Sequence, residues 1–323
     1  MQDTNIVNST NKIEENLNDI NEQSRNYIKD VLTLINKEIG VNKIISILLF
    51  GSQRAKCDVT AVSDCDLLII FKNRVSNHHI KEIERYFIAL EIKHNFRDFS
   101  DKLSKNILGV ISQTTGIFVS HFLTKTKYWQ EANFHKIFRV NKVFSTLFAP
   151  RNIVLGSVVT NSTTLYGKEL RDKIRPRIQI KFIEMIKSTI MNLMISLFSI
   201  LLTLFKRLQP IKYQLEAIKW ALKASNFYCY RDSESLKEIT ERFISFEKMR
   251  SQKRARHFYT DFLTLRKAPV NKFSFMIRCP IRIIKIHIKA ITYRRYVGRL
   301  KKLKITPKRF EPVVPDHTFP LSL

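Results

Sequence analysis

Two aspartates, Asp64 and Asp66, lie two positions apart, and Asp66 is the first residue of the apolar run DLLIIF. Alternate residues of a β-strand project to the same side, so the two carboxylates can bind a divalent cation together. Hard oxygen ligands of this kind suit Mg²⁺, which takes few protein carboxylates and completes its octahedron with water and substrate phosphates. The pair therefore predicts a magnesium site that faces a phosphorylated substrate.

A Gly-Ser pair, Gly51 and Ser52, ends the preceding apolar run, Ile44–Phe50. Glycine permits a sharp turn and a close approach of the backbone to a ligand. Ser52 and the amides after it can donate hydrogen bonds to phosphate oxygens. Arg54 and Lys56 follow, and they either neutralise a bound triphosphate or form a solvated basic loop; the sequence leaves both open.

The order of these parts (strand, Gly-Ser, an eleven-residue loop, then Asp-x-Asp at the start of a second strand) resembles the nucleotidyltransferase domain of the DNA polymerase beta superfamily, particularly its minimal nucleotidyltransferase branch. The resemblance implies that Gly51 and Ser52 grip a nucleoside triphosphate. It also implies that Asp64 and Asp66 hold the Mg²⁺ that positions the α-phosphate for attack by an acceptor hydroxyl. With Arg54 near the phosphates, these residues form the predicted site.

The resemblance is strong over residues 44–71 and weak over a second segment, Leu165–Leu170. Many members of the family place a third carboxylate on a later strand, but the expected strand Gly116–Leu123 contains none. Either Glu131 or Asp101 reaches in from a loop, or two carboxylates suffice, or catalysis has been lost. His121, on the same strand, is expected to be a histidine with its hydrogen bonds satisfied, rather than a ligand.

The elements expected around this motif divide the chain into two halves. Helical spacing predicts helices at Ser24–Glu38, which Gly40 would terminate, and Ile80–Ile92, beside the three strands. After Pro176 only helical spacing occurs, at Lys181–Phe205, Lys212–Tyr228, Ser235–Phe246, Arg254–Arg266 and Phe275–Tyr296. We therefore expect an α+β protein, with a small mixed-sheet nucleotidyltransferase domain followed by an all-helical domain. The expected boundaries are 1–39 for an N-terminal arm and helix, 40–170, 171–310 for a basic helical domain, and 311–323 for an extended tail.

The composition limits the class of protein. The chain has 323 residues and 44% hydrophobic residues, which is enough for a core and excludes disorder as the main state. Its four cysteines have neither zinc-site spacing nor the density of a disulfide scaffold, and the N-terminus lacks the pattern of a signal peptide, so a cytoplasmic protein is expected. The formal net charge of +28 implies a polyanionic partner.

Two stretches of the helical half bear on that partner. Ser188–Phe205 contains 18 residues without a charge, and we favour a buried core helix over a membrane span there. Phe262–Phe310 contains no Asp or Glu. Within it Ile277, Ile281, Ile284, Ile288 and Ile291 are expected to pack on the domain, while Arg278, Arg282, Lys285 and Lys289 face phosphates and Tyr293 and Tyr296 stack on bases. Nucleic acid, with RNA favoured, is the expected partner, and an anionic membrane is the alternative.

A second resemblance concerns Arg250, His257 and Tyr259. Their spacing is similar to the Arg-x4-6-His-x-Tyr signature of the HEPN helical domains, which often accompany minimal nucleotidyltransferases. The resemblance implies roles in RNA cleavage or as an acceptor, although an arginine-rich segment matches such a loose spacing by chance.

The function expected from the sequence is Mg²⁺-dependent transfer of a nucleoside monophosphate from an NTP, with ATP favoured, to a hydroxyl of a nucleic acid or protein. One alternative is a catalytically inactive protein of the same fold that binds nucleic acid through its basic helical half. Another is a membrane-associated form of either.

Overall fold

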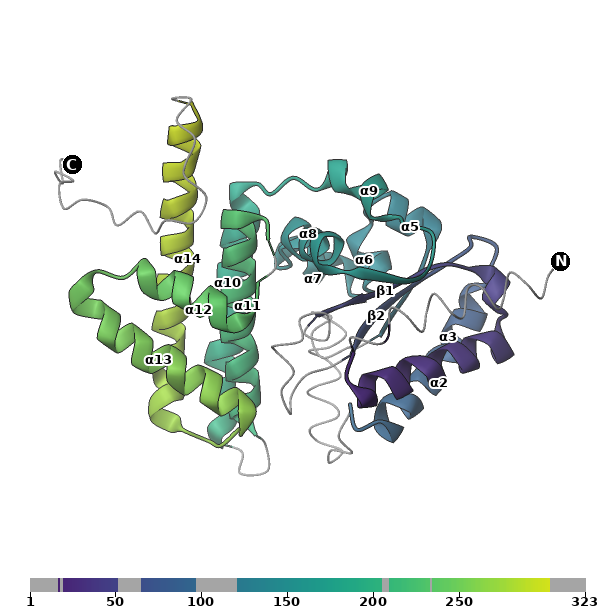
Figure 1. Cartoon of the computed structure of the whole chain (residues 1–323), viewed down its shortest axis with the longest axis horizontal. Coiled ribbons are helices and arrows are strands. Elements are labelled where there is room, and N and C mark those ends of the chain that lie inside the picture. Colours follow the sequence, from purple (N-terminus) through teal and green to yellow (C-terminus); the bar gives the residue numbers. More distant parts are fainter. Residues whose placement is uncertain are drawn as a thin grey trace. The chain divides into compact units, whose positions relative to one another are not determined.

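The computed structural model describes residues 17, 20–51, 65–96, 121–204, 209–232 and 234–302. The chain divides into two compact units, Met1–Ser188 and Thr189–Leu323. The described part of the first unit contains a mixed four-stranded sheet with helices, and the described part of the second unit is helical (Figure 1). This is the α+β class expected from the sequence.

The sheet has the order β3-β2-β1-β4 and holds strands from both ends of the first unit. Its strands are β1 (Ile44–Phe50), β2 (Asp66–Phe71), β3 (His121–Lys125) and β4 (Thr163–Gly167). β1 is antiparallel to β2 and β4, whereas β2 and β3 are parallel. The first two expected strands are confirmed. The third runs two residues past the expected end at Leu123, and residues 116–120 of that expectation lie outside the described residues.

Two long helices of the first unit cover one face of the sheet. They are α2 (Glu22–Glu38), which Asn21 caps, and α3 (Asn77–Lys93), which Ser76 caps. Their buried residues, such as Ile28 and Phe87, join Leu67 and Ile69 in one core cluster. Gly40 follows α2 with a positive φ of 89°, as expected for a helix end.

Short helices, which the sequence patterns did not reveal, supply the core of the other face. They are α5 (Thr126–Gln130), α6 (Phe134–Ile137), α7 (Lys142–Leu147), α8 (Arg151–Asn161) and α9 (Arg171–Ile174). Residues around Trp129, Ile137 and Leu155 pack there against Leu68 and Ile70. Helices of four to six residues contain too few turns for a periodic pattern, so most of them could not be predicted from hydrophobic spacing.

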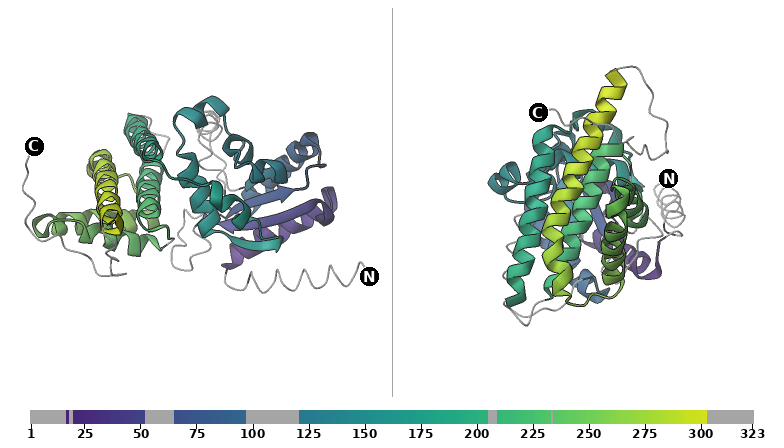
Figure 2. Two further views of the ribbon diagram at one scale, coloured as in Figure 1. Left: turned by 90° about the horizontal axis from the view of Figure 1, so that it is seen from above. Right: turned by 90° about the vertical axis from the view of Figure 1, so that its left-hand side faces the viewer.

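The second unit contains the helices expected after residue 176. These are α10 (Phe182–Leu201), which begins in the first unit and continues as a 3₁₀ turn (Leu202–Leu204), α11 (Pro210–Tyr230), α12 (Leu236–Ser245), α13 (Met249–Lys267) and α14 (Phe273–Lys302). Within this unit α11 and α14 pack along each other, and α10 contacts α14 through Asn192 and His287 (Figure 2). Pro210 begins α11 at a position where its missing N–H costs nothing.

The α10 helix differs from the expected buried core helix. Its buried side is polar, because Ser188, Asn192, Ser196 and Ser199 are all 0% exposed. Apolar residues lie on the opposite side and are exposed, as the following residues show: Ile190, Met194, Leu197, Phe198 and Leu201. The polar side finds hydrogen-bond partners inside the helical unit, in Gln214 and His287. By length and composition alone, Phe182–Leu204 is also the one helix of the described chain that is apolar enough to span a membrane.

The α14 helix corrects the expectation about which of its faces is buried. Four of the five isoleucines expected on the core side are exposed: Ile277, Ile281, Ile284 and Ile288. The buried side instead holds Phe275, Met276, Cys279, Ile283, Ile286 and Ala290. Both sides of this helix are apolar, so helical spacing could not decide between them.

The basic stripe of α14 is not free to bind phosphates in the way expected. Arg282 and Lys289 pair with Glu247 at 2.9 and 2.6 Å, and Arg278 pairs with Asp261 at 3.4 Å. The counter-charge that Phe262–Phe310 lacks therefore comes from Asp261 and Glu247, which both precede this segment in the sequence. Tyr293 packs against Tyr230 and Phe246, and so is not an open stacking platform.

The structure also separates the residues of the HEPN-like pattern. His257 is 69% exposed in its side chain and faces Asp261 at 3.7 Å, whereas Tyr259 is buried beneath the guanidinium of Arg282. Burial raises the pKa of Tyr259 well above its ordinary value. The side chains of His257 and Tyr259 lie on different sides of α13, so these two residues of the pattern do not share a site.

Candidate active site

The turn after β1 brings Gly51 against the carboxylate of Asp66. Phe50 and Asp66 are partners in the antiparallel register, so the turn begins beside the first residue of β2. Gly51 has a φ of 80°, and a Cβ built on it would lie 2.0 Å from Oδ2 of Asp66. Any larger residue would collide with the carboxylate and strain the backbone. The glycine of the predicted phosphate-binding turn therefore packs directly against the predicted metal ligand.

A buried tyrosine of α2 lies in the electrostatic field of this carboxylate. Tyr27 is 0% exposed, and its hydroxyl has no hydrogen-bond partner among the described residues. Burial raises its pKa far above the ordinary value, and the charges of Glu91, Cys65 and Asp66 raise it further. Tyr27 therefore stays protonated and leaves one unused hydroxyl donor beside two carboxylates.

The sequence analysis did not identify Glu91 as a carboxylate of this region. It lies on α3, and its Oε1 is 2.6 Å from Nδ1 of His121 at the start of β3. Both side chains are 4% exposed, so the pair is buried. His121 is a paired histidine, as expected, and also packs on Phe87 with ring centroids 5.1 Å apart. In the sequence, Glu91 is marked only as a charged residue on the buried face of an amphipathic helix, which does not by itself indicate a function.

The residues considered for a third carboxylate have different positions. Glu131 follows α5, beyond the far end of β3, and is exposed, so it is not at the Asp66 end of the sheet. Asp101 lies outside the described residues. Since Leu67 and His121 are partners in the parallel register, the Glu91–His121 pair adjoins the strand end that carries Asp66. Among the described residues, Glu91 is therefore a buried carboxylate on the α3 side of this strand end, whereas alternation along β2 places Asp66 on the opposite side, with Leu68.

Three predicted site residues, Asp64, Ser52 and Arg54, lie outside the described residues. Among the residues that are described, no cluster of three or more His, Cys, Asp or Glu could hold a metal ion. The described part of the predicted donor set is compatible with Mg²⁺, because Asp66 offers carboxylate oxygens directly beside Gly51. Asp66, with Asp64 two residues before it, would hold the ion.

The segment with the weaker resemblance forms the edge strand β4 and the residues after it. β4 pairs with β1, the strand that leads into Gly51. Gly167 at its end has a φ of 81°, and a Cβ there would lie 2.1 Å from the carbonyl oxygen of Ile45. Glu169 binds Arg171, whose hydrogen bonds lower the pKa of this carboxyl to about 2. The segment thus holds the first strand of the site in place.

Comparisons with known proteins give a likeness in structure alone. No family profile and no curated protein matches the sequence. Among solved structures, the chain is similar to spectinomycin adenyltransferase AAD(9) from Enterococcus faecialis, whose structure was determined with ATP and spectinomycin. The TM-score is 0.49 at 9% identity, over 82% of this chain and 98% of that chain. Function therefore has to be inferred from the residues of this chain.

Proposed function

We propose that the protein is a Mg²⁺-dependent nucleotidyltransferase that moves a nucleoside monophosphate from an NTP, with ATP favoured, to a hydroxyl of a nucleic acid or protein. The observation that carries this proposal is the contact between Gly51 and Asp66, which joins the predicted phosphate-binding turn to the predicted metal-binding strand. The resemblance of residues 44–71 to the polymerase beta superfamily points to the same chemistry.

In this reaction the acceptor oxygen forms a bond to the α-phosphorus, the bond to pyrophosphate breaks, and the acceptor hydroxyl loses its proton. Gly51 and Ser52 would bind the triphosphate, Arg54 would neutralise part of its charge, and Asp64 and Asp66 would hold Mg²⁺. The ion, when bound, would stabilise charge on the entering and leaving oxygens. The Glu91–His121 pair would fix the strand end beside Asp66.

The test is transfer of labelled nucleotide by purified protein with Mg²⁺, each of the four NTPs, and total RNA. Asp66→Asn removes the charge but keeps the shape, and should lower transfer by roughly 10²–10³-fold. Asp172→Asn is the matched control, because this aspartate has a 74% exposed side chain on α9. If the folded wild-type protein transfers no label with any NTP, the inactive nucleic-acid-binding form replaces this proposal.

A nucleic-acid acceptor, with RNA favoured, is supported by the net charge of +28 and by exposed cations of the helical unit. Because the stripe on α14 is largely paired, the open cations lie instead on α13, where Arg250, Lys253 and Arg254 are exposed. The double variant Lys253→Ala/Arg254→Ala should weaken RNA binding and reduce its salt dependence, by a slope of about 2 on logarithmic axes. Unchanged binding and slope would exclude this surface.

A membrane-associated form is the second candidate, and a specific observation favours it. The exposed sides of α10 and α14 are apolar, with Leu201 and Ile281 each 60% exposed, although soluble helices normally turn such sides inward. Ile281→Glu should then reduce sedimentation with anionic vesicles, whereas Val143→Glu, on an exposed apolar residue of α7, should not. Equal sedimentation of all three proteins would argue against this form.

A further inference from the structure

A hollow of about 300 Å³ lies at the other end of the β2–β3 pair from Asp66. In the parallel register Leu67 pairs with His121, and Phe71 pairs with Lys125. His121 and Lys125 are four residue steps apart along the strand, so their backbones are roughly 13 Å apart. The hollow adjoins Lys125, so it is distinct from the candidate active site.

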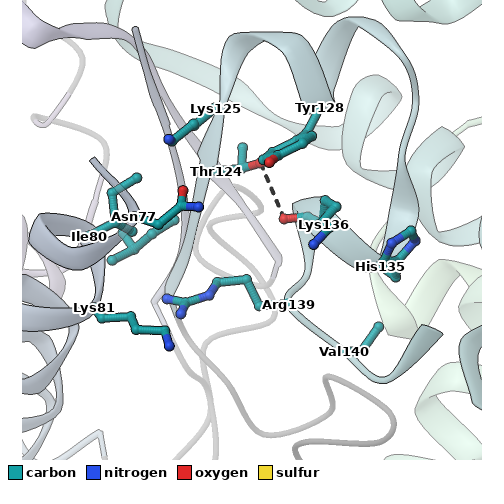
Figure 3. Close-up of a pocket in the computed structure, with 11 residues that line it drawn as sticks. Asn77, Ile80, Lys81, Thr124, Lys125, Tyr128, His135, Lys136, Arg139 and Val140 are labelled. Carbon is teal, nitrogen blue, oxygen red and sulfur yellow. Dashed lines mark hydrogen bonds between the residues drawn. The ribbon is translucent and has the colours of Figure 1, made fainter. Parts of the chain in front are cut away.

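Basic side chains from three parts of the first unit line this hollow. They are Lys81 of α3, Lys125 of β3, and His135, Lys136 and Arg139 in and after α6 (Figure 3). No carboxylate lines it; the one acidic partner recorded for these cations in the described chain is Glu84, which binds Arg139 at 2.6 Å. Burial lowers the pKa of His135, and the charges of Lys136, Lys142 and Arg151 lower it further.

Lys125 is the residue that distinguishes this hollow from an ordinary basic surface. Lysine is almost never buried without a partner, yet Lys125 is only 8% exposed. Within the described residues its ammonium group has no recorded hydrogen bond or ion pair. Cations gathered around one hollow repel one another unless an anion compensates them.

Two further features favour an anion of a particular kind. The first turn of α3 lines the hollow with Asn77 and Ile80, so the positive end of a 17-residue helix faces it. Tyr128, which also lines it, offers a hydroxyl group. The Thr124 hydroxyl instead donates to the backbone carbonyl oxygen of Lys136 at 3.4 Å, as the dashed line in Figure 3 shows. Several cations, hydroxyl donors and a helix N-terminus are the groups that bind phosphate oxygens.

We propose that this hollow is a second anion site, which binds a phosphate group through Lys125, Lys136 and Lys81. The phosphate belongs either to a small free anion, such as pyrophosphate, or to the backbone of a nucleic acid. The site is independent of the proposed transfer reaction, since none of its residues lies at the Asp66 end of the sheet.

The test is calorimetric titration of the full chain with pyrophosphate in Mg²⁺-free buffer. Lys125→Met, which keeps the apolar stem and removes the charge, should weaken binding at least tenfold, and Lys136→Ala should weaken it less. Lys173→Ala, on an exposed lysine of α9, is the matched control and should bind like the wild type. Asp66→Asn should also bind like the wild type, which separates this site from the active site.

Thermal unfolding distinguishes an anion site from a structural lysine. In buffer without phosphate, Lys125→Met should unfold at the same or a higher temperature than the wild type, because it removes one of several like charges around the hollow. Pyrophosphate should raise the melting temperature of the wild type but not of the variant. A variant that is less stable without phosphate and equally stabilised by it would overturn the proposal.

A single-stranded 12-nucleotide RNA distinguishes the two sources of the phosphate. If Lys125→Met weakens RNA binding and pyrophosphate competes with the RNA, the backbone of a nucleic acid is the ligand. If Lys125→Met weakens pyrophosphate binding alone, the ligand is a free anion. Wild-type protein that binds neither probe, or binds both as well as Lys125→Met does, contradicts the site.

Discussion

The two ends of the β2–β3 strand pair differ in the sign of their charged groups and in how far those charges are paired. At the Asp66 end, the charged groups are closely held: Glu91 is paired with His121, and Asp66 lies against Gly51. At the Lys125 end, several cations gather around a hollow with a single recorded acidic partner, Glu84. Removing a charge should therefore destabilise the protein at the first end and leave it unchanged or more stable at the second.

The largest effect on stability is expected for Glu91→Ala. This substitution leaves the buried His121 without its partner, and breaking a buried ion pair typically costs about 3–5 kcal/mol. Chemical denaturation of the variant and the wild type measures the difference. Glu82→Ala, on the exposed side of α3, serves as the control and should change the free energy of unfolding by less than ~0.5 kcal/mol. A loss as small as that for Glu91→Ala would mean that the pair is not structurally important.

Gly51→Ala should have the next largest effect. The added Cβ meets the carboxylate of Asp66, and the positive φ costs a non-glycine residue about 1–2 kcal/mol. Displacement of Asp66 should also reduce nucleotide transfer more than it reduces stability. Gly40→Ala, at a positive φ where an added Cβ would lie 3.2 Å from the flexible side chain of Asn42, separates backbone strain from the collision. Equal transfer activity in Gly51→Ala and Gly40→Ala would show that the contact with Asp66 has no role in transfer.

Tyr27→Phe should change the alkaline limb of the stability curve. The folded-state pKa of Tyr27 lies above its unfolded value near 10, so the stabilising contribution is complete below pH 10 and is lost as pH rises above it. Between pH 10 and 11 the wild type should lose about 1 kcal/mol more than the variant. At pH 7 the variant should be nearly as stable as the wild type, because the hydroxyl has no recorded partner. Parallel pH profiles for the two proteins would show that Tyr27 ionises freely when folded.

The smallest effect is expected for Lys81→Ala at the basic end. Relief of repulsion from Lys125, Lys136 and Arg139 should stabilise the protein by about 0.5 kcal/mol at low salt, and added salt should remove the difference. Thermal unfolding at two ionic strengths measures this. A clear loss of stability at low salt would mean that the two ends of the strand pair handle charge in the same way.

Comparison of the expected and observed helices shows where sequence patterns fail. The spacing in α14 correctly predicts a helix, but its exposed side carries Ile277 and Ile281 while its buried side carries Phe275 and Ile283. A pattern that is apolar on both sides predicts a helix but does not determine which side is buried. In α10 the expectation was a buried core helix, whereas the structure buries serines and an asparagine against Gln214 and His287 and exposes apolar residues such as Leu197 and Phe198.

Glu91 shows the same limit at the candidate site. A glutamate among the polar and apolar residues of an amphipathic helix gives no sign of function, since only the packing of α3 on β3 brings it to His121. The basic hollow was missed for a similar reason. Lys81, Lys125 and Lys136 are far apart in the sequence, and only the edge strand with its two flanking helices brings them together.

The sequence by itself determined the strands β1 and β2 and the order of helices after residue 176, and it supplied Gly51 and Asp66 as predictions for the site. These features depend on contiguous residues, whose local pattern and chemistry can be recognised without knowledge of the fold. Only the tertiary structure decided which sides of α10 and α14 are buried, that Glu91 pairs with His121, and where the cations of the hollow gather. Those outcomes depend on contacts between segments distant along the chain, and no local pattern specifies such contacts.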